Sequence, residues 1–145
     1  MTRAEKALSL FGDDFNCTQS VLAPFAKDYE LEEEKALRLA CGFGGGMGCT
    51  ARTCGAVTGA FMVIGLKYGK YEAKDKESKP LTYRKVKEFI EEFEKRHGSI
   101  ECRELVGIDI SSEKGLAEAR GKKLFRSICT KIVEDAVNVL ENVIL

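Results

Sequence analysis

Apolar residues recur every three or four positions along most of the chain, the spacing of an amphipathic α-helix. This pattern covers residues 3–11, 17–25, 31–41, 82–97 and 111–145. No segment alternates apolar and polar residues as a half-buried β-strand does. The sequence therefore predicts an all-α fold. In it, Thr82 caps one helix, and residues 111–145 form mainly one long helix that is weakened at its start by Gly115 and Gly121.

Residues 54–66 are apolar on almost every side. A helix of this kind is surrounded by other helices. A buried strand is the alternative, but the segment is long for a strand. We therefore expect a helical bundle around a central helix over about residues 50–68, within a single domain of residues 1–145. The small residues Gly55, Ala56 and Gly59 leave room for another backbone or a cofactor on one face of this helix.

Charge and composition narrow the class of partner. Lys+Arg and Asp+Glu both number 23, so the chain lacks the basic excess of a nucleic-acid-binding protein. The longest apolar stretch is well short of the ~20 residues that span a bilayer, so we expect no membrane insertion. No secretory or transit peptide is recognisable at the N-terminus. We expect a cytoplasmic protein, whose thiols are normally reduced.

Six cysteines carry the candidate chemistry. Without an oxidising compartment, they are expected to bind metal, to be redox-active or to be buried. Cys17, Cys54 and Cys102 each fall at or near a predicted helix start, where the helix dipole stabilises thiolate and lowers the thiol pKa. Cys129 falls on an apolar stripe, as a core residue would. The spacings contain no Cys-x-x-Cys and no Cys/His zinc pattern, so they leave buried cysteines and a shared thiol site about equally supported.

Residues 42–48 hold five glycines and cannot continue a helix cheaply. Most simply, this loop is a tight connection between helices. Alternatively, its backbone amides cradle an anion beside Arg52. The loop follows no strand, so it does not indicate a dinucleotide-binding fold. The candidate cofactor-binding residues are Gly44, Gly45, Gly46 and Gly55.

Several ordered motifs run through nearly the whole chain. They are Phe15–Leu22, Gly42–Gly48, Cys54–Ala60, Gly98–Leu105 and Cys129. In this order they resemble the redox-active protein family named for its C_GCAxxG_C_C cysteine signature, which occurs mostly in anaerobic bacteria and archaea. The resemblance implies that four residues are the hallmark cysteines of the family: Cys17, Cys54, Cys102 and Cys129. Cys41 and Cys49 flank the glycine loop and depart from the family pattern; of the two, Cys49 is the better functional candidate.

Three functions remain open at this point. In the first, which we favour, the four hallmark cysteines bind an iron–sulfur cluster and exchange electrons with a redox partner protein. In the second, the same four thiolates hold a structural zinc ion. In the third, the protein is a cofactor-free thiol/disulfide oxidoreductase, with Cys54 attacking and Cys17 or Cys49 resolving the mixed disulfide. The apolar tail, residues 139–145, is a candidate homodimer contact.

Overall fold

The computed structural model describes the whole chain, residues 1–145, and confirms the all-α fold. Eight α-helices are joined by short 3-10 turns and one π-helical turn. The helices are α1 (Arg3–Gly12), α2 (Cys17–Ala26), α3 (Glu33–Ala40), α4 (Gly55–Tyr68), α5 (Ser78–His97), α6 (Cys102–Val106), α7 (Glu113–Gly121) and α8 (Thr130–Val143). The shorter turns are η1 (Lys27–Tyr29), η2 (Cys41–Phe43) and the π-helical η3 (Phe125–Cys129).

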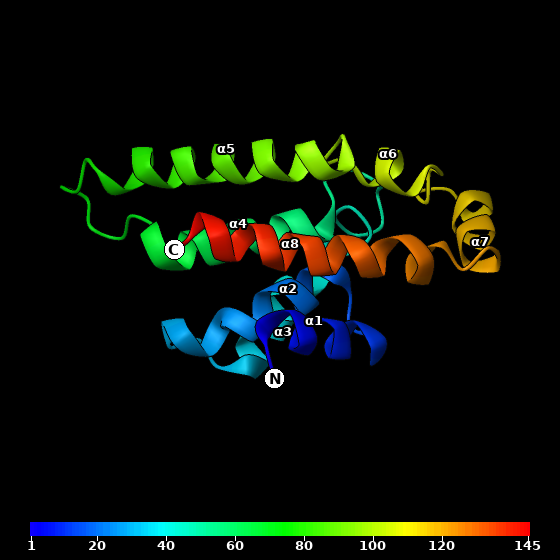
Figure 1. The fold of residues 1–145 in the computed structure, drawn as a ribbon, viewed down its shortest axis with the longest axis horizontal. Helices are drawn as coiled ribbons and strands as arrows, with labels where there is room; N and C mark the ends of the chain where they lie inside the picture. Colours follow the sequence, from blue (N-terminus) through cyan, green and yellow to red (C-terminus); the bar gives the residue numbers. More distant parts are fainter.

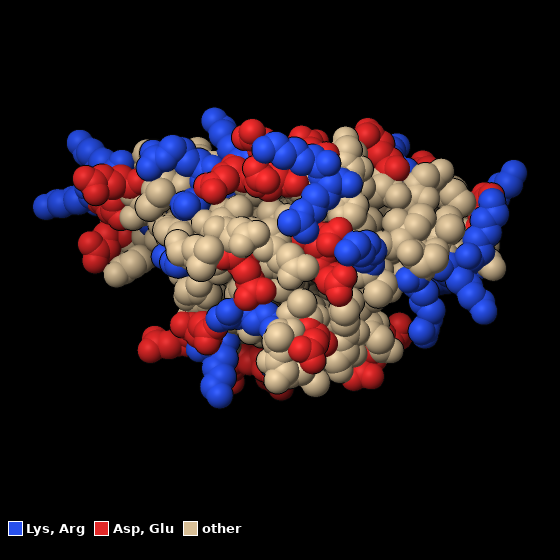
Figure 2. Space-filling view, viewed as in Figure 1, with Lys and Arg blue, Asp and Glu red and all other residues tan.

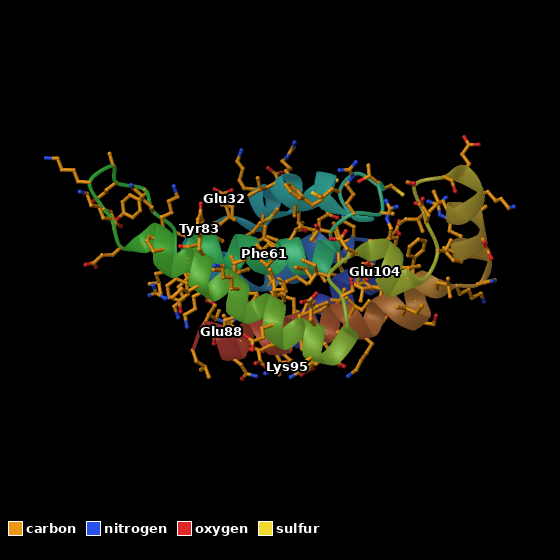
Figure 3. All side chains as sticks on the ribbon, turned by 90° about the horizontal axis from the view of Figure 1, so that it is seen from above. Glu32, Phe61, Tyr83, Glu88, Lys95 and Glu104 are labelled. Atoms are coloured by element: carbon orange, nitrogen blue, oxygen red, sulfur yellow. The ribbon has the colours of Figure 1, made fainter.

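The long helices lie in layers (Figure 1). Helix α5 forms one side, α4 and α8 run between, and α1, α2 and α3 cover the other side. Helix α4 packs against α2, α5 and α8. The short helices α6 and α7 sit together at one end of the bundle; seen from above, α6, marked by Glu104, lies between α7 and the main helices (Figure 3).

The apolar side chains form two separate clusters. The larger one fills the bundle and includes Phe25, Phe89 and Phe93, all fully buried. The smaller one lies under α6 and α7 and centres on Val106 and Ile110. The two clusters meet at the end of the bundle, and each contributes cysteines there. The candidate site therefore lies at a junction between two cores.

The helix predicted over residues 50–68 begins later, at Gly55. Ala51 has a left-handed φ of 59°, and Cys54 is extended at the N-cap, so neither residue can belong to the helix. Thr53 instead forms an isolated antiparallel bridge with Glu101. The helix starts later than predicted because Thr53, which the prediction included in the helix, pairs with a distant segment of the chain instead.

Two other predicted boundaries are wrong. Residues 111–145 form two helices, because Lys123 adopts a left-handed φ of 55° after α7 and the chain restarts in a π-helical turn before α8. Helix α5 begins at Ser78, and Thr82 lies inside it. The carboxylate of Asp75 accepts hydrogen bonds from the backbone N–H groups of Glu77 and Ser78, at 2.9 and 3.0 Å, and so takes the capping role.

The apolar tail packs into its own chain. Val139, Leu140 and Val143 are at most 2% exposed. The ammonium groups of Lys67 and Lys85 donate to carbonyl oxygens at the end of α8, which would otherwise lack partners. The homodimer contact predicted for residues 139–145 stays a prediction. Because Val139, Leu140 and Val143 are buried within their own chain, they do not support it. No helix in the chain combines the length and apolarity needed to cross a membrane.

Candidate functional site

Backbone pairing fixes the positions of two of the hallmark cysteines, Cys54 and Cys102. Around the bridge between Thr53 and Glu101, the N–H of Cys54 donates to the carbonyl of Ile100 at 2.7 Å. The N–H of Cys102 donates to the carbonyl of Arg52 at 2.6 Å. These bonds join the start of α4 to the start of α6. Both side chains are buried, with 6% of Cys54 and 7% of Cys102 exposed.

Cys17 comes to the same place from α2. The side chain of Asn16 caps this helix by accepting from the N–H of Gln19 at 3.0 Å, which makes Cys17 its first residue. The amide of Asn16 also donates to the carbonyl of Cys41 at 2.9 Å, tying α2 to the glycine loop. A Cβ atom at Gly55 would lie only 2.7 Å from Cys17 Sγ. The missing side chain at Gly55 therefore allows Cys17 to approach the start of α4.

Cys129 arrives from the opposite side, at the end of the π-helical turn that leads into α8. It is half-buried and packs against the smaller apolar cluster, together with Cys49. Single π-helical turns inside α-helices recur at functional sites because they shift the side chains of one turn. The structure thus brings all four hallmark cysteines together from four different helical segments.

All six cysteines line one cavity of about 810 Å³ between the two apolar clusters. Cys41 is exposed at its edge, whereas Cys49 is half-buried and its thiol donates to the carbonyl of Ile110 at 3.5 Å. The four glycines singled out as candidate cofactor-binding residues, Gly44, Gly45, Gly46 and Gly55, also line it. The cavity is therefore the place where every candidate residue of the sequence converges.

The glycine loop has an unusual backbone. Residues 45–49 all have positive φ angles between 61° and 70°. Left-handed conformations cost L-residues about 1–2 kcal/mol each, so Met47 and Cys49 carry strain that Gly45 and Gly46 avoid. A Cβ atom at Gly46 would also lie 2.8 Å from Cys102 Cβ. Glycine is thus needed here for both conformation and close approach, and strained backbone of this kind clusters at functional sites.

Burial controls the protonation of the hallmark thiols. Burial is the largest cause of the raised pKa of Cys17. The hydrogen bond from the backbone N–H of Gly45 has the opposite effect and lowers this pKa. Burial, and then the charge of Cys17, raise the pKa of Cys54 well above its usual value. Burial and charge repulsion by Cys17 also raise the pKa of Cys102 to about 11 and that of Cys129 to about 12.

The predicted helix-start positions of Cys17, Cys54 and Cys102 are confirmed, but the expected lowering of their pKa is wrong. Backbone N–H groups at the start of α4 do lower the pKa of Cys54, as the helix-dipole argument requires. Desolvation is the larger effect, because removing a thiolate from water costs more than these N–H groups return. The charge of Cys17 contributes to the raised pKa of the three other hallmark thiols that line its cavity.

Three residues of the site escaped the sequence argument. The hydroxyl of Thr18, beside Cys17, is fully buried and has no hydrogen-bond partner in the protein. A Cβ atom at Gly55 would lie 2.5 Å from this oxygen, so it faces the start of α4. Arg120 and Arg126 line the cavity from α7 and η3. Only Arg126 carried a sequence signal, because it precedes Cys129 by three residues and so shares its helix face.

The four thiols are not arranged around a single point. No group of three or more His, Cys, Asp and Glu side chains is placed to hold one metal ion. A tetrahedral zinc site has Zn–S distances of about 2.3 Å, which requires its sulfurs to lie within about 4 Å of one another. The hallmark cysteines line a cavity larger than such a site.

Comparison with known proteins supplies the family. A family model described as "Putative redox-active protein (C_GCAxxG_C_C)" matches residues 15–143, most of the chain. No curated protein and no solved structure matches the chain. The matched region contains all six cysteines, the glycine loop and every helix of the site. The chain therefore belongs to the C_GCAxxG_C_C family of redox-active proteins.

Proposed function

We propose that the protein transfers electrons through an iron–sulfur cluster held by the four hallmark cysteines. One observation carries the proposal: four thiols from four helical segments line one cavity, and the charge of Cys17 raises the pKa of the other three. Held by these four cysteines, a cluster would supply one-electron transfer between a reduced donor and an oxidised acceptor.

The charge balance of the site supports a cationic occupant. The four thiols stay protonated at neutral pH, because desolvation raises the pKa of each and the charge of Cys17 raises the pKa of the other three. Metal ions reverse this balance, because a coordinating thiol loses its proton outright. Binding of iron would therefore release protons from the hallmark cysteines and supply the positive charge that their thiolates lack.

The protein's own groups would hold and tune the sulfurs. Backbone N–H groups near Cys17 and at the start of α4 favour the thiolate form of the sulfurs they face. The hydroxyl of Thr18 is an unused donor beside Cys17. Hydrogen bonds to sulfur and limited solvent access are the means by which proteins set the potential of such clusters. Together with the buried Cys54 and Cys102, these donors suit a site of this type.

The two alternatives fit less well. A zinc ion bound by the same four residues needs its ligands around one point, which the side chains do not offer. In a [4Fe–4S] cluster each cysteine binds its own iron atom, so the sulfurs need not meet around one metal ion. Cofactor-free exchange works best with an accessible thiol whose pKa is near the ambient pH. Cys54, the predicted attacking thiol, is buried and its pKa is raised well above its usual value.

The test is metal and sulfide analysis of the full chain purified under nitrogen. Iron and acid-labile sulfide should be present in similar amounts, with a visible charge-transfer spectrum. Cys54→Ser and Cys129→Ser should each lose most of both. The matched control is Cys41→Ser, which changes an exposed cysteine at the edge of the same cavity and should keep both.

Other results would overturn the proposal in distinct ways. Zinc without sulfide would establish a structural metal site. Thiols that alkylate rapidly, in protein without any metal, would establish thiol/disulfide exchange. Equal loss of iron in Cys41→Ser and Cys54→Ser would show that the hallmark cysteines are not the ligand set.

A further inference from the structure

The cavity is larger than the cysteine site needs. Its volume of about 810 Å³ falls in the range of about 300–1,000 Å³ that is typical of small-molecule sites. One part of its wall beyond the cysteines is apolar and comes from the smaller cluster under α6 and α7, with Val106, Ile110, Leu116 and Phe125 among the lining residues. This part of the cavity can hold an organic molecule next to Cys102 and Cys129.

Two exposed arginines, Arg120 and Arg126, line the same cavity. Neither has a carboxylate within ion-pair distance. The arginines that do pair with carboxylates are Arg3, Arg38, Arg96 and Arg103. The only carboxylate among the lining residues is that of Asp14, which belongs to the turn before α2 and pairs with neither arginine. Two guanidinium groups at the cavity are thus free to bind a ligand.

The surrounding surface reinforces their charge. Residues 113–126 contain five basic and two acidic residues, although the whole chain is neutral. Figure 2 shows Lys and Arg side chains gathered over this end of the molecule, at the right of the view. A local excess of one sign beside a cavity raises the concentration of oppositely charged ligands there.

We propose that the cavity binds a small organic anion, with its apolar part against the α6–α7 wall and its anionic group on Arg120 and Arg126. A guanidinium holds a carboxylate or phosphate through two parallel hydrogen bonds, which fixes the orientation of the ligand. This orientation would place the apolar part toward Cys102 and Cys129. The proposal deepens the proposed function by naming the class of molecule that reaches the cysteines. It rests on that function only for the claim that this molecule is the redox substrate.

The test uses two dyes of nearly the same shape. 8-Anilinonaphthalene-1-sulfonate is an anion with apolar aromatic rings, and N-phenyl-1-naphthylamine is its neutral analogue, which lacks the sulfonate. Each is titrated by equilibrium dialysis under nitrogen against the full chain, and the free dye is measured on the protein-free side so that protein colour does not interfere. The variant is Arg120→Gln with Arg126→Gln. The matched control is Arg84→Gln with Lys87→Gln, which removes two exposed positive charges of α5 that also lack a carboxylate partner and do not line the cavity.

We expect the anionic dye to bind about 2- to 30-fold more weakly to the Arg120/Arg126 variant, the range for two exposed ion pairs. The neutral dye should bind equally to both proteins, and the Arg84/Lys87 control should match the parent with either dye. Since all four substituted residues are exposed, helix content by circular dichroism should be unchanged. As a second measurement, the anionic dye should protect Arg120 and Arg126 from phenylglyoxal in the parent.

The proposal is overturned if the anionic dye binds the parent and the Arg120/Arg126 variant equally. Equal weakening in the Arg84/Lys87 control, or an equal loss of the neutral dye, would also overturn it. Iron and sulfide in the same samples report on the cluster separately. Arginine-dependent anion binding without iron would leave this inference standing while the proposed function fails, and the reverse pattern would do the opposite.

Discussion

The contact between α2 and α4 sets the separation of Cys17 from Cys54, and it depends on Gly59. A Cβ atom added at Gly59 would lie 2.9 Å from the carbonyl oxygen of Thr18 and 3.1 Å from Val21 Cβ. The first of these atoms belongs to the backbone of α2 and cannot turn aside. Gly59→Ala therefore has to push the two helices apart.

The size of the effect follows from two opposing terms. Overpacking a well-packed core costs about 1–3 kcal/mol. Alanine in place of glycine within a helix returns about 1 kcal/mol. Gly65, in the same helix, is the matched control, because a Cβ atom there would meet nothing within 4 Å and only the favourable term applies. We expect Gly59→Ala to be about 1–3 kcal/mol less stable than Gly65→Ala, since the propensity term is common to both.

The assay is thermal unfolding of the full chain, followed by circular dichroism with chelator and reductant present. At about 2–4 °C per kcal/mol for a protein of this size, Gly59→Ala should melt about 2–12 °C below Gly65→Ala. Urea unfolding at constant temperature should give the same order. If Gly59→Ala is as stable as Gly65→Ala, α2 and α4 are not in the close contact described here, and the placement of Cys17 beside Cys54 loses its basis.

Three further outcomes are expected. Thr18→Val removes a buried hydroxyl without a partner and should stabilise the metal-free protein by about 1 kcal/mol in urea unfolding; a loss of stability would reveal a hidden partner. In the folded protein the thiol pKa is raised to about 11 at Cys102 and to about 12 at Cys129. As pH rises, the unfolded chain therefore loses these protons before the folded protein does. The stability of the metal-free protein should consequently fall as pH rises above about 9. Cys129→Ala should make this decline shallower, and an unchanged slope would contradict the assignment. Asp135→Asn should cost about 2 kcal/mol, because this buried carboxylate bonds to His97 and forms ion pairs with Arg96 of α5 and Lys131 of α8; the less buried Glu134→Gln is the control and should cost much less.

Local rules in the sequence determined most of the helices. A helix repeats every 3.6 residues and closes its hydrogen bonds within four, so its pattern and caps can be read from short stretches of chain. Asn16 was therefore recognisable as the cap that makes Cys17 the first residue of α2, and the glycine run 42–48 as an interruption. The ordered cysteine motifs likewise indicated the family, because the order of motifs along the chain can be recognised without knowing the fold.

Only the tertiary structure decided how the cysteines meet and what state they are in. The bridge between Thr53 and Glu101 pairs segments nearly fifty residues apart, and it displaced the predicted start of α4. The pKa values of Cys54 and Cys102 are raised, whereas their helix-start positions predicted lowered values. Desolvation depends on atoms from every element around a thiol, but the helix-start effect is local. The convergence of Arg120 and Arg126 on the same cavity has the same origin. Periodicity is a property of neighbours in sequence, but burial and charge are properties of neighbours in space.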